Sequence, residues 1–131
     1  MLSRLLFIPE WKKVDRVVMT GKKAVENEDL ATVMSLVAEE YGDDFGMDYE
    51  RLEKWFITHF RNYDDIKVFI PYKKITVDDG VAVCSLRVSV RALNQSTGEP
   101  EVIYGYSAWG DELILDLKKI NKRWLFTKAK P

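Results

Sequence analysis

His59 is the side chain in this sequence that is best suited to acid/base chemistry. It is the only histidine, and imidazole is the side chain whose charge ordinarily changes near neutral pH. It follows Leu52 by seven residues, so both lie on one apolar stripe if this segment is a helix. A histidine on such a stripe can also be a hydrogen-bonded core residue with no chemical role. The pattern leaves both interpretations open.

Asp111 is a second candidate for a general acid or base. It alternates with Leu113 and Leu115, which would direct it to the buried side of a strand. Burial there would raise the pKa of the carboxyl group. Two structural alternatives compete with this role: a bulge could turn Asp111 to solvent, or Arg87 or Arg91 could pair with it.

Asp43 and Asp44 complete the set of catalytic candidates. They lie between two glycines in a tight turn, which polar turn-forming residues explain without any chemistry. The next acid, Asp48, fits the N-cap of the helix that follows. If Tyr41 and Phe45 anchor the turn at the mouth of a pocket, either aspartate could face a molecule that enters it.

Three helices are expected to position these side chains. Apolar residues recur every three or four positions over residues 9–26, 29–41 and 48–60, which is the period of an amphipathic helix. Asn27 or Asp29 can cap the second helix.

Gly21 stands out on the apolar stripe of the first helix. Glycine inside a helix costs about 1 kcal/mol relative to alanine. We therefore expect a compensation at this position, either the close approach of another backbone or room for a cavity.

The second half of the chain has the two-residue alternation of strands, first over residues 66–77 and then over 81–93. Asp78–Asp79–Gly80 between them predicts a hairpin turn. Pro71 cannot donate to a sheet ladder, so the first strand should lie at an edge or contain a bulge. A polar loop at residues 94–100 leads into further strands. The order predicts an α+β fold, with three N-terminal helices packed on an antiparallel sheet of about four to six strands.

The composition limits the kind of partner. The length of 131 residues predicts a single domain over residues 1–131. A net charge of -1 offers no positive field for nucleic acid. The only cysteine, Cys84, lies in a strand pattern and should be a packed thiol. No set of histidine and acidic residues has metal-ligand spacing, so we expect neither a metal ion nor another cofactor.

Residues 1–8 form a short apolar N-terminal segment. Its apolar run is too short for a signal peptide or a membrane span. We expect a cytoplasmic protein that does not enter a membrane, or a secreted or periplasmic one if a leader has been removed. The segment itself should pack on the body of the protein or on a second subunit.

Three segments resemble the nuclear-transport-factor-2-like, or cystatin-like, α+β cone superfamily. The helix DLATVMSLVAEEY (residues 29–41) ends in a tyrosine and an acidic turn, and the helix DYERLEKWFITHF (48–60) follows closely. The final hairpin DELILDLKKINKRWLF (111–126) carries an Arg-Trp pair. The chain is most similar to uncharacterised SnoaL-like and ketosteroid-isomerase-like domains of this superfamily.

The resemblance implies a curved sheet wrapped around the helices, a pocket at the wide end of the cone, and a homodimer formed through the outer face of the sheet. On that basis we expect the ligand-binding residues to be Tyr41, Trp55, Phe56, His59, Tyr104, Tyr106, Trp109 and Asp111. The other tryptophan of the second half, Trp124, should lie in the core, and a core position also suits Trp109.

Known catalytic patterns of the superfamily fit the sequence poorly. No tyrosine lies on the first helix to build an isomerase oxyanion hole, and one histidine cannot supply the dehydratase pair. Two aspartates bridged by Arg87, as in epoxide hydrolases, could come from Asp43 or Asp44 and Asp111. We therefore expect a non-catalytic domain that binds a small apolar ligand or self-associates. The alternative is a small lyase, isomerase or cyclase acting by general acid/base catalysis.

Overall fold

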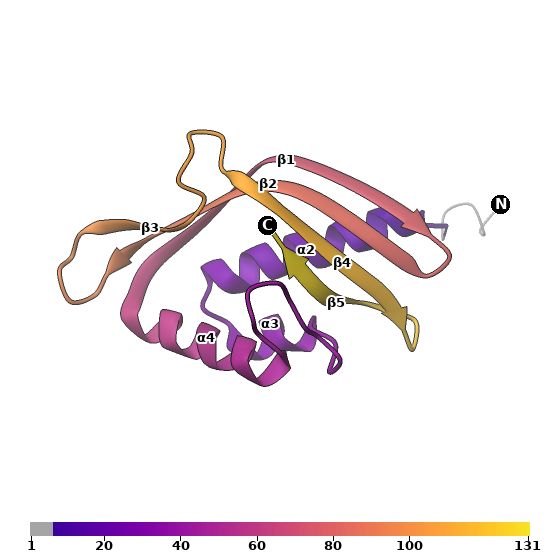
Figure 1. Ribbon diagram of the computed structural model, residues 1–131, viewed down its shortest axis with the longest axis horizontal. Coiled ribbons are helices and arrows are strands. Elements are labelled where there is room, and N and C mark those ends of the chain that lie inside the picture. The colour runs from indigo at the N-terminus through magenta and orange to yellow at the C-terminus, as the bar shows by residue number, and fades with distance from the viewer. Residues whose placement is uncertain (1–6) are drawn as a thin grey trace.

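The computed structural model describes residues 7–131 as helices covered by a curved antiparallel sheet (Figure 1). The helices α2, α3 and α4 come first and the five strands follow, which confirms the predicted α+β fold. The elements are α2 (Glu10–Glu26), α3 (Leu30–Ser35), α4 (Tyr49–Asn62), β1 (Tyr63–Asp78), β2 (Val81–Asn94), β3 (Pro100–Tyr104), β4 (Asp111–Ile120) and β5 (Arg123–Lys130).

Helices α2 and α4 begin where the sequence predicts. Helix α2 follows Pro9, and its Val14 and Val18 are buried against the sheet. Asp48 caps α4 by accepting a hydrogen bond from the Arg51 N–H at 2.9 Å. Local capping and periodicity therefore determine these two boundaries.

Helix α3 is shorter than the predicted 29–41 segment, because it ends at Ser35. Asp29, not Asn27, caps its start by accepting from the Thr32 N–H. Beyond its end, the Ala38 N–H donates to the Phe126 carbonyl and the Phe126 N–H donates to the Leu36 carbonyl. The backbone thus leaves the helix to pair with β5, which helical periodicity alone does not reveal.

The first hairpin of the sheet confirms two sequence predictions. Its turn contains Asp79 and Gly80, both with positive φ (47° and 76°). Pro71 lies on β1, an edge strand of the order β1-β2-β4-β5, where the register shifts between Phe69 and Tyr72. A proline at an edge bulge leaves no ladder hydrogen bond unmade.

Strands β3 and β4 pair with successive parts of the same strand. Strand β3 pairs with the end of β2 from Val90 to Leu93, and β4 pairs with its earlier part from Val81 to Val88. The connecting residues 105–110 form a loop that stands above the convex side of the sheet in Figure 1. The further strands expected after the polar loop at residues 94–100, over residues 102–119, are therefore separated by a second loop, residues 105–110.

Two groups of buried side chains hold the layers together. One joins α2 to the sheet around Val14, Cys84, Leu117 and Trp124. Cys84 is a buried free thiol, as predicted, and burial raises its pKa to about 11. The other group joins the helices around Ala24, Val33, Met34, Val37, Tyr41 and Leu52.

Trp109 does not share the core position predicted for it, because 71% of its surface is exposed. It lies on the loop 105–110, whose side chains leave the regular in-and-out alternation of the strands. No helix within residues 7–131 has both the length and the apolar character needed to cross a membrane. Most of the predicted N-terminal segment 1–8 lies outside the described residues.

Candidate functional site

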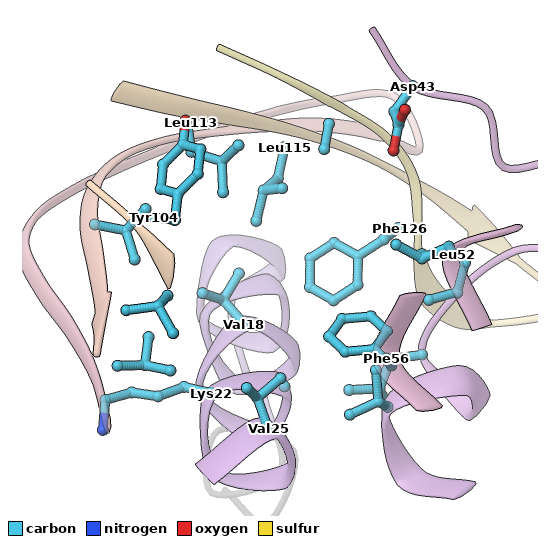
Figure 2. Close-up of a pocket in the computed structure, with 18 of the residues that line it drawn as sticks. Val18, Lys22, Val25, Asp43, Leu52, Phe56, Tyr104, Leu113, Leu115 and Phe126 are labelled. Carbon is cyan, nitrogen blue, oxygen red and sulfur yellow. The ribbon is translucent and has the colours of Figure 1, made fainter. Parts of the chain in front are cut away.

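A cavity of about 550 Å³ lies between the two buried groups, inside the curve of the sheet (Figure 2). Its helical wall comes from α2 and α4, through Val18, Val25 and Phe56. Its sheet wall draws on all five strands and includes the alternate residues Leu113 and Leu115 of β4, because side chains of one parity along a strand face the same side. The walls are almost entirely apolar. Further wall residues are Val33, Leu36, Val37, Met47, Leu52, Val68, Ile70, Leu86, Val88, Val90, Ile103, Phe126 and Ala129.

Gly21 forms part of the cavity wall and explains some of its volume. A Cβ atom at this position would lie 3.7 Å from the side chains of Leu36 and Phe126, with no backbone atom among its near neighbours. Two compensations were expected for this helical glycine. The structure shows the second of them, room for a cavity, because Gly21 borders the empty space. A larger side chain here would extend into the empty space.

A tyrosine and a carboxylate form the polar part of the cavity. Tyr41 donates its hydroxyl hydrogen to Oδ2 of Asp43 at 2.6 Å. The other oxygen, Oδ1, accepts the backbone N–H groups of Phe45 and Met47, both at 2.9 Å. Asp43 therefore shapes its own loop while its carboxylate points toward the cavity in Figure 2.

Tyr41 is held in its neutral form. Burial, and then the hydrogen bond to the Asp43 carboxylate, raises the pKa of Tyr41 above its ordinary value of 10.0. The phenol consequently keeps its hydrogen and donates it to Asp43 over the whole physiological pH range.

Lys22 lies at the other side of the cavity from Asp43 (Figure 2). Its ammonium group is 3.0 Å from Oε1 of Glu26, and Oε2 of Glu26 accepts the Val68 N–H at 2.9 Å. Although burial raises it, the Val68 N–H and the Lys22 ammonium together hold the pKa of Glu26 below its ordinary value. The positive charge of Lys22 is thus already neutralised within the protein.

Aromatic rings connect the cavity to the surface. The rings of Phe45 and Tyr104 meet edge to face, with centroids 6.4 Å apart. Phe45 is 45% exposed and Trp55 is 37% exposed, yet both also line the cavity. These residues therefore mark the entrance, consistent with the expectation that Tyr41 and Phe45 anchor the acidic turn at the mouth of a pocket.

Five of the residues singled out from the sequence lie in the cavity wall: Tyr41, Asp43, Trp55, Phe56 and Tyr104. The other candidates, which are Asp44, His59, Tyr106, Trp109 and Asp111, lie outside it.

His59 is on the predicted helix face but too far along the helix to line the cavity. Seven residues of helix advance about 10 Å along the axis, and the cavity ends before this position. The His59 ring stacks on Trp55 with centroids 3.9 Å apart, and its Nδ1 lies 2.8 Å from the Trp55 carbonyl oxygen. His59 therefore does not line the cavity.

Asp111 also lies outside the cavity, at the start of β4. Its carboxylate accepts the Tyr106 N–H at 3.3 Å and so stabilises the loop 105–110. Arg87 donates to the carbonyl oxygens of Trp109 and Gly110 and not to this carboxylate. Tyr106 and Trp109 are exposed on the same loop. Three residues that the family resemblance placed in the pocket therefore lie outside it, in this loop or directly after it.

The bridged pair of aspartates considered for epoxide hydrolysis is not formed. Asp44 is paired with Lys128 at 3.2 Å, Asp43 is bound to Tyr41, and Arg87 binds loop carbonyls. Within residues 7–131, no three histidine, cysteine or acidic side chains are grouped as a metal site.

Lys22 and Val25 also line the pocket, although neither was expected there from the sequence. The available signal was the apolar stripe of α2, where Val18, Gly21 and Val25 recur at helical spacing. That stripe indicates burial, but it does not distinguish a filled core from a cavity.

Several solved structures share the fold of this chain. No protein-family model matches the chain, and no curated protein is detectably similar to it in sequence. A candidate scytalone dehydratase from Novosphingobium aromaticivorans superposes with a TM-score of 0.79 at 12% identity, over 92% of this chain and 80% of that one. A nuclear-transport-factor-2-like superfamily protein from Salmonella enterica serovar Typhimurium has a TM-score of 0.75 at 12% identity, over 90% and 86%.

A third similar structure is a candidate aromatic ring hydroxylase from Novosphingobium aromaticivorans. Its TM-score is 0.75 at 14% identity, and the match covers 94% of this chain and 89% of that one. Identities this low show a shared fold only. The chain therefore has the nuclear-transport-factor-2-like, cystatin-like α+β fold, as its sequence pattern indicated.

Proposed function

We propose that this protein binds one compact apolar organic molecule in the cavity between its helices and its sheet. The observation that carries the proposal is the cavity itself, whose volume of about 550 Å³ falls in the range of ligand pockets. Its apolar walls and single Tyr41–Asp43 pair also have the usual makeup of a binding site, with few polar groups to orient a ligand.

A neutral fluorescent probe, N-phenyl-1-naphthylamine, tests the proposal directly. Substitution Gly21→Leu would place four carbons in the cavity, while Gly21→Ala adds a methyl group at ordinary contact distance from Leu36 and Phe126. We expect the unaltered protein and Gly21→Ala to bind the probe. Gly21→Leu should weaken binding by about tenfold or more, since the added side chain takes up part of the space that the probe needs.

Thermal unfolding of each variant provides the control for folding, and Val25→Phe offers a second way to fill the cavity from α2. Failure of the unaltered protein to bind, or equal binding by folded variants with a filled cavity, would contradict the proposal.

A catalytic role is the second candidate, and Asp43 is the residue that favours it. It is the one acid/base candidate from the sequence whose carboxylate lines the cavity. In this role Asp43 would remove a proton from an apolar substrate, as a base in a lyase or isomerase. The candidate dehydratase of similar fold supports this class of reaction by analogy. A purified protein that binds apolar molecules without converting them would exclude this role for those molecules.

A further inference from the structure

At Tyr41 and Asp43 the cavity offers hydrogen-bond acceptors and no free side-chain donor. A phenol has one hydrogen, and that of Tyr41 is already given to Oδ2 of Asp43 at 2.6 Å. The ionised carboxylate of Asp43 can only accept. A bound molecule therefore meets lone pairs of Tyr41 Oη and Asp43 Oδ2 at this position, and needs a donor group of its own.

One acceptor position on Asp43 is still available to such a donor. A carboxylate has about four lone-pair positions. Oδ1 already accepts the N–H groups of Phe45 and Met47, and Oδ2 accepts only the Tyr41 hydroxyl. The spare position thus lies on Oδ2, next to the free lone pairs of the Tyr41 oxygen.

The negative charge of Asp43 has no ion-pair partner among residues 7–131. The nearby Lys128 forms its ion pair with the neighbouring Asp44. The cation on the cavity wall, Lys22, is neutralised by Glu26 on its own helix. Charges act more strongly beside apolar walls than in water. The cavity is therefore expected to favour a positive ligand group at Asp43 and to disfavour a negative one.

We propose that the ligand is an apolar amine, whose ammonium group binds Asp43 Oδ2 and Tyr41 Oη while its apolar body fills the cavity. This inference rests on the proposed binding function and specifies its chemistry. Asp43 is half-buried at the entrance, so the ammonium group keeps contact with water as its hydrocarbon part enters. A ketone or a carboxylate lacks the donor that this end of the cavity requires.

Three probes with the same hydrocarbon chain test the inference: decylamine, decanol and decanoate. Each is titrated at neutral pH against the protein carrying N-phenyl-1-naphthylamine, and displacement gives its affinity. We expect decylamine to bind about tenfold more tightly than decanol, because its hydrogen bonds are charge-assisted. Decanoate should be the weakest of the three.

Asp43→Asn is the informative variant because the amide oxygen can still accept the Phe45 and Met47 N–H groups. It removes the charge, and the advantage of decylamine over decanol should fall to about threefold or less. Asp44→Asn is the matched control, because Asp44 is adjacent, pairs with Lys128 and lies outside the cavity. It should retain the full advantage.

Decanol or decanoate binding the unaltered protein as tightly as decylamine would overturn the inference and leave the proposed function intact. A folded Asp43→Asn protein that keeps the amine advantage would also overturn it. If no probe binds at all, the proposed function fails and this inference fails with it. The order of the three probes on the unaltered protein decides the question even if Asp43→Asn does not fold.

Discussion

Tyr41 gives the clearest pH-dependent signal at the scale of single residues. Burial and the Asp43 hydrogen bond raise its pKa in the folded protein above the ordinary 10.0. Above that pH the unfolded chain loses the phenol proton while the folded protein keeps it. The contribution of Tyr41 to the free energy of unfolding should therefore be fully present below about pH 10 and should fall as the pH rises further.

The variant Tyr41→Phe isolates this contribution. It should lose about 1.5–3 kcal/mol at neutral pH through the missing hydrogen bond to a carboxylate. Between about pH 9 and pH 11 its stability should decline less steeply than that of the unaltered protein. Urea unfolding at several pH values measures both effects, and the other tyrosines and lysines cancel in the comparison. Parallel declines would show that Tyr41 does not hold its proton in the folded state.

The candidate site was partly predictable, because the positions of some of its side chains follow from the local sequence pattern alone. Tyr41 and Phe56 follow from the end of the apolar helix pattern and from the inner face of α4, and both line the cavity. His59 shares that face, but the part of α4 that lines the cavity ends at Phe56. Such a limit arises from packing between distant segments, which periodicity within one helix cannot show.

At the scale of helices and strands, two glycines at the ends of the loop 105–110 determine how β3 and β4 are joined. Both have positive φ, 80° at Gly105 and 75° at Gly110. A Cβ on Gly105 would overlap the Val88 carbonyl oxygen, and a Cβ on Gly110 would lie 2.7 Å from it. The loop can pack on β2 only because these residues lack a side chain.

Gly105→Ala should therefore destabilise the protein by about 3 kcal/mol, through backbone strain and a steric clash together. The matched control is Gly98→Ala, whose φ is also positive (72°) but whose Cβ would meet nothing within 4 Å. It should cost only about 1 kcal/mol. Chemical denaturation of both variants measures the difference, and equal losses would mean that the close approach to Val88 has no energetic effect.

Sequence pattern predicted the helices and the first hairpin well, since their signals are contained within short segments. The caps of α3 and α4 and the positive-φ turn at Asp79 and Gly80 are examples. The early end of α3 and the loop 105–110 were not predictable in this way. Each depends on a partner strand, β5 in one case and β2 in the other, that is distant in the sequence.

At the scale of the whole molecule, the convex side of the sheet carries large exposed aromatic side chains. Phe69 is 53% exposed and Trp109 is 71% exposed. Both border a surface hollow that also includes Pro71 and Arg91. Because Val68 lines the cavity, Phe69 points to the opposite side of β1. Exposed apolar groups of this kind are typical of protein interfaces.

We propose that two copies of the chain associate through this convex side. The double variant Phe69→Glu and Trp109→Glu should then shift the mass in sedimentation experiments from that of a dimer to the 15.3 kDa of one chain. Its thermal stability should change little, because substitutions of exposed side chains usually alter stability by about 0.5 kcal/mol or less. Trp11→Glu is the control, since Trp11 is 52% exposed on α2 and not on the sheet. A dimer dissociated only by Trp11→Glu would place the interface on the helical side, and a monomeric unaltered protein would exclude self-association.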